Sequence, residues 1–186
     1  MRVREILAEV AHIAENKDMK DKILLKQESS IEEVAEKLEV LLSCYNSVMK
    51  SIALNYDEIV KTAIVYGKNA NVNAVADVFL KLVSVTDLDG NPISYEVIGN
   101  QIFVNEERFE YTYRCIPLEQ GIDDIAICTR RVISEHAYIC GTLAEYFLRQ
   151  NRIEEAQNWE NRFRQAVEVK TDFKKRNLKA GKKWGL

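Results

Sequence analysis

The sequence lacks several features that would place it quickly in a class of protein. It has no run of 18 apolar residues, so we expect no membrane-spanning helix. Its first 16 residues carry charges throughout and have no apolar centre, so we expect no signal peptide. Its cysteines show no CxxC spacing, which favours reduced core residues over a disulfide framework. The four are Cys44, Cys115, Cys128 and Cys140.

Glycine is scarce, and the glycines within the body of the chain stand alone. With seven glycines and no Walker pattern, the sequence offers no phosphate-binding loop. No HExxH motif occurs either. The acidic pairs at 32–33 and 154–155 lie in the expected first turns of helices, where carboxylates favour the helix dipole. We therefore expect neither catalysis nor a cofactor.

Histidine is the scarcest ligand-forming residue, with two copies. His136 and Cys140 lie on one helical stripe together with Cys128 and Val132, at spacings of four. Such a pair could share a soft metal, but a third and a fourth ligand are missing, since the other histidine is His12. A Cys–His nucleophile would also need an orienting third group. The stripe is more simply apolar core, and we predict no metal site.

The residues that are present indicate a packed protein with an uneven charge. Of the 186 residues, 47% are hydrophobic and 30% are charged, which suits one domain with a small inserted or appended element. The net charge is −3, from 26 basic and 29 acidic residues. Residues 170–186 hold seven basic residues and one acid, a net of +6, so the remainder holds 19 and 28, a net of −9. An acidic body therefore carries a basic C-terminal arm.

The stretch from Phe79 to Pro117 has a period of two. In residues 109–115, aromatic residues and a cysteine alternate with polar residues, which is typical of a half-buried strand. Residues 89–92 form a turn signal, and Gly99–Asn100 form a two-residue hairpin signal. We predict a four-stranded antiparallel β-meander over residues 77–118. Such a sheet has one apolar face and must pack on helices or on a neighbouring subunit.

Helical spacing dominates the rest of the chain. We expect amphipathic helices at residues 3–16 and about 30–55, a long helix opened by Asp123–Asp124, and a last helix from about Ile153. The break at 150–152 is short, so the last two helices should form a hairpin. Residues 57–65 fit a strand or a short helix, and residues 66–71 read as a loop. The predicted fold is α+β, mainly α, with N-terminal bundle helices at 1–76, the meander at 77–118, a helical hairpin at 119–169 and a basic extended arm at 170–186.

The arm allows two functional interpretations. Its cations could bind nucleic-acid phosphates, or its apolar residues could anchor it in a groove of a partner protein while the cations meet an acidic rim. The interleaved apolar residues and the terminal tryptophan favour docking, because a merely solvated tail would rarely end on tryptophan. The predicted partner-binding residues are Phe173, Lys174, Lys175, Arg176, Leu178, Lys179, Lys182, Lys183 and Trp184.

This arrangement resembles a family of phage head-to-tail adaptor proteins, the tail tubular protein A and connector type. The pattern Y-x-V-x-G-x-x-I is similar to the family's second hairpin and begins here at Tyr95. The pattern Y-x-x-R is similar to its strand before the long helix and lies at Tyr111 and Arg114, with Leu143 and Ala144 in that helix. Residues 156–177 resemble its closing helix. The resemblance covers residues 77–186, and the long charged segment between the first two helices departs from it.

The resemblance implies a structural virion protein. Its subunits would form a ring, usually of twelve, between the portal protein and a tail or nozzle protein. The C-terminal arm would insert into the portal, and DNA would pass through the lumen without sequence-specific binding. The protein would occur in the virion, and in the host cytoplasm during assembly. A nucleic-acid-binding module that uses the same basic arm is the alternative.

Overall fold

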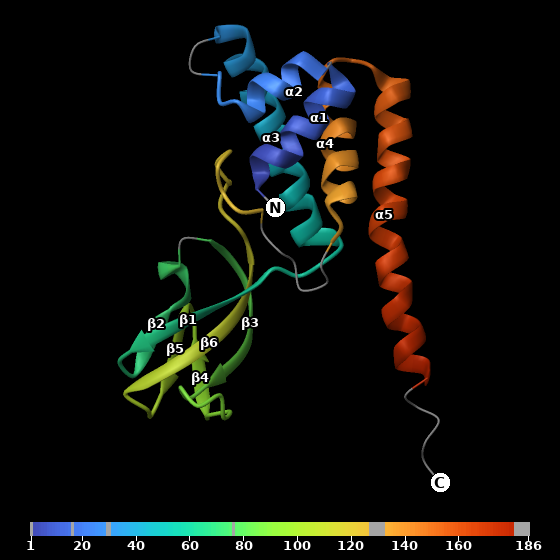
Figure 1. Ribbon diagram of the computed structural model, residues 1–186. Coiled ribbons are helices and arrows are strands. Elements are labelled where there is room, and N and C mark those ends of the chain that lie inside the picture. Colours follow the sequence, from blue (N-terminus) through green and yellow to red (C-terminus); the bar gives the residue numbers. More distant parts are fainter. Residues whose placement is uncertain (1, 16, 29–30, 76, 127–132, 181–186) are drawn as a thin grey trace. The chain divides into compact units, whose positions relative to one another are not determined.

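The chain is mixed helix and sheet, about half helical and a quarter strand. The computed structural model describes residues 2–15, 17–28, 31–75, 77–126 and 133–180, with residues 169–180 described by backbone only. These residues contain five α-helices and two small antiparallel sheets (Figure 1). The chain divides into two compact units. The helical unit comprises residues 1–51 and 120–186, and the β unit comprises residues 52–119.

The first helices follow the amphipathic pattern of the sequence. The helices are α1 (Val3–Ala14), α2 (Lys17–Leu24), α3 (Glu32–Asn55), α4 (Glu135–Arg149) and α5 (Ile153–Ala180). The prediction of the first helix is confirmed, and α1 buries Val3, Ile6, Leu7 and Val10 completely. The prediction of a long helix up to Asn55 is also confirmed.

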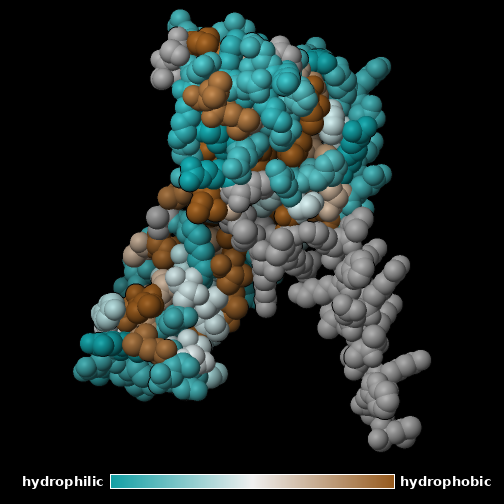
Figure 2. All heavy atoms as spheres, viewed as in Figure 1, coloured by the Kyte–Doolittle hydropathy of each residue, from teal (hydrophilic) through white to brown (hydrophobic). Residues whose placement is uncertain are grey.

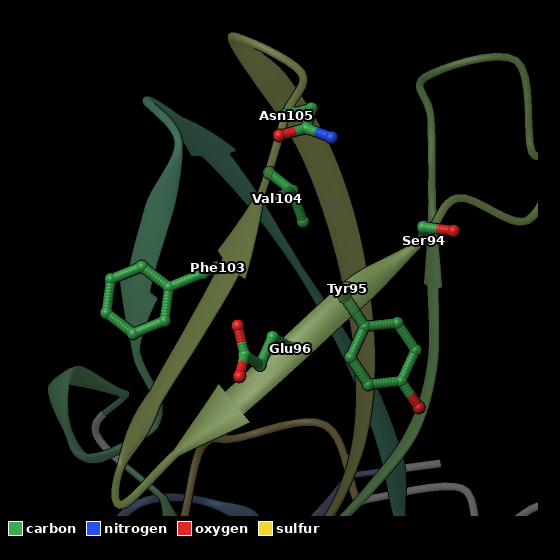
Figure 3. A pocket seen from close by; sticks show the side chains of 6 residues that line it. All are labelled: Ser94, Tyr95, Glu96, Phe103, Val104 and Asn105. Atoms are coloured by element: carbon green, nitrogen blue, oxygen red, sulfur yellow. The ribbon is translucent and has the colours of Figure 1, made fainter.

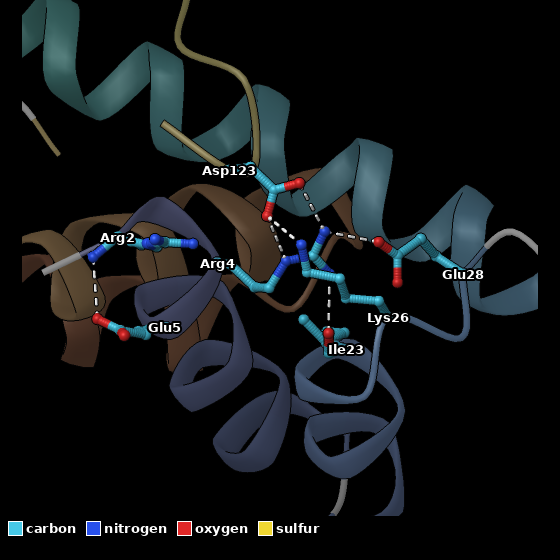
Figure 4. A network of polar contacts seen from close by, with 7 residues as sticks. All are labelled: Arg2, Arg4, Glu5, Ile23, Lys26, Glu28 and Asp123. Atoms are coloured by element: carbon cyan, nitrogen blue, oxygen red, sulfur yellow. Dashed lines mark hydrogen bonds and ion pairs between the residues drawn. The ribbon is translucent and has the colours of Figure 1, made fainter. Parts of the chain in front are cut away.

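A buried arginine joins α1 to two later segments of the helical unit (Figure 4). Arg4 Nε donates to Asp123 Oδ1 at 2.9 Å, and Nη1 donates to the Ile23 carbonyl at 2.8 Å. Arg4 Nη2 also lies 2.7 Å from Glu28 Oε1. The hydrogen bond from the Arg4 guanidinium lowers the pKa of Asp123 to about 2; burial opposes this effect and Lys26 adds to it. It also lowers the pKa of Glu28. These carboxyls therefore stay ionised at neutral pH and fasten α1.

Asp123 was predicted to open the long helix, and this prediction is wrong. Residues 122–124 form a turn against α1, where Arg4 N donates to the Ile122 carbonyl at 2.8 Å. The helix α4 begins at Glu135, after Ser134 in an extended conformation. The acidic pair that suggested a helix start is used instead for pairing with Arg4 and for accepting a hydrogen bond from Gly121 N at 2.6 Å. Residues 127–132 lie outside the described residues.

A second polar cluster joins α1, α3 and α4. The buried Tyr146 hydroxyl donates to the Glu15 carboxylate, and Lys37 Nζ donates to the same carboxylate at 2.9 Å. Burial alone would raise the pKa of Glu15, but the hydrogen bonds from Tyr146 and Lys37 lower it. Burial also raises the pKa of Tyr146 to about 12, with the hydrogen bond to Glu15 adding to it. The carboxylate thus stays charged and the phenol stays protonated, which keeps the cluster intact at neutral pH.

The last two helices pack against each other in the helical unit (Figure 1). The three residues 150–152 connect them, and Asn151 takes a left-handed conformation with φ of 60°. Gly141 of α4 permits the close approach, because a Cβ built there would lie 3.1 Å from Phe163 Cδ2 of α5. Since Gly141 is level with Phe163, Glu135 at the start of α4 is level with about residue 169. Residues 170–180 of α5 therefore extend beyond α4.

The β unit holds two three-stranded antiparallel sheets. One has the strand order β1-β6-β3, and the other has the order β2-β5-β4. A short 3-10 helix, Val72–Ala74, follows β2. The strands are β1 (Val60–Tyr66), β2 (Asn69–Asn71), β3 (Val78–Thr86), β4 (Tyr95–Ile98), β5 (Gln101–Val104) and β6 (Arg108–Ile116).

The four-stranded meander is not the observed arrangement. Residues 77–118 do form four strands, but β3 pairs with β6 and β4 pairs with β5, in separate sheets. Each sheet takes its third strand from residues 60–71, which the sequence left undecided or assigned to a loop. A run as short as Asn69–Asn71 carries no readable period, and its pairing with β5 decides its structure. The predicted hairpin at Gly99–Asn100 is confirmed.

The inner strand of the first sheet bears the predicted alternation. Phe109, Tyr111, Tyr113 and Cys115 of β6 are buried, while the residues between them are half-buried. The tyrosine rings of 111 and 113 lie 5.5 Å apart, and Phe79 of β3 stacks on Tyr113 at 5.9 Å. This aromatic row is the core of the β unit. This row determines which face of β6 points inward. It therefore also determines which side chains of β1 and β3, the strands on either side of β6, point outward.

Candidate interaction surfaces

The C-terminal part of α5 holds most of the residues predicted to bind a partner. Phe173, Lys174, Lys175, Arg176, Leu178 and Lys179 lie in the last turns of this helix. The prediction of an extended chain is therefore wrong for residues 170–180. Lysine, arginine, leucine and alanine are good helix formers, and basic residues are favourable at a helix C-terminus. Lys182, Lys183 and Trp184 lie outside the described residues.

The projecting part of α5 concentrates positive charge. Residues 170–180 carry five basic residues and one acid, a net of +4. At about 1.5 Å per residue, these eleven residues make a helical extension of about 16 Å. A helix that extends beyond its neighbour with this charge can bind an acidic groove or a phosphate backbone. In a helix, with its period near 3.6, different anchor residues share one face than in the extended chain that was predicted.

The β unit exposes apolar side chains that the sequence analysis did not single out (Figure 2). All four residues of β4 are exposed, including Tyr95, Val97 (51% exposed) and Ile98. On β1, Ile64 and Tyr66 are 54% and 76% exposed. Strands usually bury one face, so β4 is unusual in burying neither. No sequence pattern predicts this exposure, because the alternation in β4 and β5 is the same whether or not a second layer covers them.

These exposed residues lie on opposite edges of the sheets. The strands β1 and β2 form one edge, the strands β3 and β4 form the other, and β6 and β5 lie between them. Within the described residues, no further strand pairs with β1 or β4, whereas the end of β3 is bridged at Thr86 by Pro92. The edge of β3 is interrupted by two irregularities in its register with β6, whereas β1 and β4 pair regularly. Regular, apolar edge strands are the kind that add another strand.

A shallow cavity of about 210 Å³ adjoins the edge at β4 (Figure 3). It is lined by Ser94, Tyr95, Glu96, Phe103, Val104 and Asn105. The residues Glu96 and Phe103 are directly opposite each other on β4 and β5, as are Tyr95 and Val104. These two pairs lie on opposite faces of the hairpin, so the cavity lies at the edge of the strands, with Tyr95 on one face and Glu96 on the other. This lining suits an aromatic or cationic side chain better than a polar metabolite.

The histidine–cysteine pair comes together without completing a site. Cys140 Sγ and His136 Nε2 lie 3.4 Å apart on α4. Burial raises the pKa of the Cys140 thiol, which disfavours the thiolate that a nucleophile or a metal ligand needs. No group of three or more possible metal ligands occurs among the residues that the structure describes. The other members of the stripe, Cys128 and Val132, lie outside those residues.

The prediction that the cysteines are buried and reduced is confirmed for three of them. Cys44, Cys115 and Cys140 are free and buried. Burial raises the pKa of Cys44 and of Cys115 to about 11, so both are protonated core residues. Among the described helices, none is long and apolar enough to cross a membrane. The chain matches no known protein-family model, and no curated protein is detectably similar to it in sequence.

Proposed function

We propose that this chain is a structural virion protein, a head-to-tail adaptor of a phage or of a device derived from one. Its subunits form a ring between the portal protein and a tail or nozzle protein. The ring, of about twelve subunits as the resemblance implies, surrounds the DNA channel. The C-terminal segment of each subunit docks into the portal. The protein performs no catalysis, binds no cofactor and works in the virion after assembly in the host cytoplasm.

The observation that carries this proposal is the helix α5, which extends beyond α4 and ends in a basic segment. The eleven residues 170–180 project as a helix of net charge +4, and the six residues that follow include Lys182, Lys183 and Trp184. A projecting segment with interleaved apolar and basic residues suits a groove that has an apolar floor and an acidic rim. Phe173, Leu178 and Trp184 are the proposed anchors.

The charge of the remaining chain supports a DNA channel. Residues 1–169 carry a net charge of −9, and the β unit alone has ten acidic and five basic residues. A surface that retains DNA must neutralise phosphates with cations, whereas an acidic surface lets the polyanion pass. The motifs behind the resemblance also occur in secondary structure of the expected kind. Tyr95, Val97, Gly99 and Ile102 belong to the β4–β5 hairpin, and Tyr111 and Arg114 belong to β6.

The alternative, a nucleic-acid-binding module, is favoured by the same basic segment. The cations of residues 170–186, together with Phe173 and Trp184, could neutralise phosphates and stack on bases. The two functions differ in what the apolar anchors do. For a docked adaptor they supply most of the binding energy, whereas for a phosphate-binding arm the lysines do.

The test is whether the chain binds the portal protein of the same particle. Co-sedimentation and negative-stain imaging measure this binding. Deletion of residues 170–186 should leave a folded protein that no longer binds the portal ring. The double variant F173A/W184A should lose binding as well, while K182Q/K183Q should weaken it less. Unchanged portal binding after the deletion would refute the docking role. As a control for surface changes elsewhere, Lys22→Gln on α2 should bind like the unaltered chain.

A further inference from the structure

We propose that copies of this chain associate head to tail through the β unit, with β1 of one copy added to the free edge of β4 of the next. The proposal rests on the proposed function for its biological setting, a ring. Its physical basis is separate, since it uses only residues of the β unit. The partner is a second copy because the two edges of one β unit are complementary. Both present a regular strand with exposed apolar residues, and their charges have opposite signs.

The strand β4 needs a cover that its own chain does not supply in the described residues. Its four residues are exposed on both faces, and the three largest are Tyr95, Val97 and Ile98. Val97 of β4 is paired in register with Ile102 of β5, so the two side chains lie on the same face of the sheet. Ile102 is completely buried whereas Val97 is exposed, so this face is covered over β5 but not over β4. Leaving this apolar strip in water is unfavourable, and an added strand would bury it while pairing the open backbone groups.

The opposite edge offers such a strand. The strand β1 has seven residues in regular register with β6, and its outward residues include Thr62, Ile64 and Tyr66. Addition of β1 to β4 would place Ile64 and Tyr66 beside Val97 and next to the cavity at Tyr95 and Glu96. Tyr66 is well suited to enter that cavity, because it is 76% exposed and aromatic. The guanidinium of Arg108 lies over its ring, 5.5 Å from the centroid, and would approach Glu96.

The charges of the two edges have opposite signs. Residues 60–71, which contain β1 and β2, include two lysines and no acid. Lys61 is held by Asp77 within the unit, and Lys68 is exposed. Residues 78–98, which contain β3 and β4, include Asp87, Asp89 and Glu96 and one lysine. Hydrogen bonds from Asn91 lower the pKa of Asp87, so it is ionised. Like edges would repel each other and unlike edges attract, which favours a head-to-tail contact.

A contact between two different edges has a definite consequence for assembly. Each subunit keeps one free edge of each kind, so the association closes into a ring or continues as a filament. It cannot stop at a symmetric dimer. This property separates the proposal from a simple pairing of β4 with β4.

The test uses two variants that each damage one edge, I64D on β1 and V97D on β4. In sedimentation velocity, the full chain should self-associate as its concentration rises. Each variant alone should self-associate at least about tenfold more weakly. An equal mixture of the two should form a 1:1 dimer and nothing larger, because each retains one intact edge. The same change at Leu25, which is 68% exposed in the helical unit, should have no effect on self-association.

Several results would overturn the proposal. These are a full chain that stays monomeric at all concentrations, a mixture that forms no dimer, and a loss of association with V97D but not with I64D. Far-ultraviolet circular dichroism checks that the variants fold, and Y66E with I98K serves as a second pair if they do not. Deletion of residues 170–186 should leave self-association intact. Since that deletion is read out on portal binding, failure of the adaptor function and failure of the edge contact are distinguishable.

Discussion

Gly141 lies where three helices of the helical unit come close together. A Cβ at this position would lie 2.7 Å from Val48 Cγ1 of α3 and 3.1 Å from Phe163 Cδ2 of α5. In an open helix, Gly→Ala stabilises by about 1 kcal/mol. At Gly141 we expect the opposite sign, because Val48 is β-branched and Phe163 is buried, so neither can move freely. Gly141→Ala should lower the free energy of unfolding by about 1–3 kcal/mol in urea titrations.

A matched change at Gly121 provides the control. A Cβ there would come no closer than 3.5 Å to the nearest atom, Asp124 Oδ2, which is ordinary contact. Gly121→Ala should therefore change the free energy of unfolding by about 0.5 kcal/mol or less. If Gly141→Ala stabilised the protein as an open helical position does, the three helices would not be packed as closely as described.

Arg4 makes the stability of the helical unit dependent on acid. The folded protein holds the pKa of Asp123 at about 2, below the value of about 4 in an unfolded chain, and also lowers that of Glu28. A lowered pKa stabilises the folded state fully above the unfolded value, and this contribution is lost as the pH falls towards the folded value. We predict that Arg4→Met destabilises by about 1–3 kcal/mol at neutral pH, because the Ile23 carbonyl also loses its donor.

The pH dependence identifies the cause of this loss. The difference in stability between the unaltered chain and Arg4→Met should narrow as the pH falls from about 5 to about 2. Urea titrations at stepped pH measure it. Lys22→Met removes the exposed i,i+4 pair with Asp18 and should cost about 0.5 kcal/mol or less. A difference that stays constant down to pH 2 would mean that Arg4 acts by packing and through its bond to the Ile23 carbonyl, and not through its carboxylate partners.

At the scale of elements, α5 divides into a packed part and a projecting part. The first part packs against α4 and buries Ala156, Phe163 and Val167, while residues 170–180 extend beyond the start of α4. We predict that Lys175→Pro lowers the helical circular dichroism signal while the unfolding midpoint stays nearly unchanged, because proline breaks only the projecting turns. In contrast, Phe163→Ala should cost about 3–5 kcal/mol.

Lys175→Ala is the control for the lost side chain, and it should retain the helical signal. If Lys175→Pro left the circular dichroism signal unchanged, residues 170–180 would not form a helix in the free protein. If it lowered the unfolding midpoint as much as Phe163→Ala, the projecting turns would be packed against the rest of the chain.

The elements that could be predicted from the sequence are those with a long and regular period. The helices α1 and α3 and the strand β6 repeat their apolar residues often enough to determine both type and buried face. The start of α4 could not be predicted, because Asp123 resembles a helix-opening acid and its pairing with Arg4 spans 119 positions. The three-residue β2 likewise depends on its partner β5. Errors thus occur where a distant contact decides the structure.

At the scale of the whole molecule, one of the two candidate surfaces could be predicted from the sequence and the other could not. The basic C-terminal segment is visible as a count of charges, and its position after α5 follows from the chain order. Its helical form was missed, because the glycines at 181 and 185 suggested that the whole segment lacks regular structure. The exposed edge at β4 was also missed, since Tyr95–Ile98 resembles any half-buried strand. Only the folded structure reveals it, since all four residues of β4 are exposed there.

The separation of charge along the chain gives a prediction that distinguishes an adaptor from a DNA-binding module. Residues 1–169 carry −9 and residues 170–186 carry +6. Up to seven cations could contact phosphates, which would give a slope of the binding constant against salt, on logarithmic axes, of about −6. For an adaptor we expect the full chain to bind duplex DNA at low salt and to release it at physiological salt, because the acidic body repels the polyanion. Fluorescence anisotropy with labelled duplex DNA measures both.

The anchors should separate the two kinds of binding. F173A/W184A removes no charge, so weak DNA binding at low salt should persist, while binding to the portal ring should be lost. Replacing Lys174, Lys175 and Arg176 by glutamine should do the reverse, abolishing DNA binding and weakening portal binding only in part. If the full chain still held DNA tightly at physiological salt, the polyanion would be the ligand of the C-terminal segment. A subunit that retained DNA in this way could not line a channel through which DNA must slide.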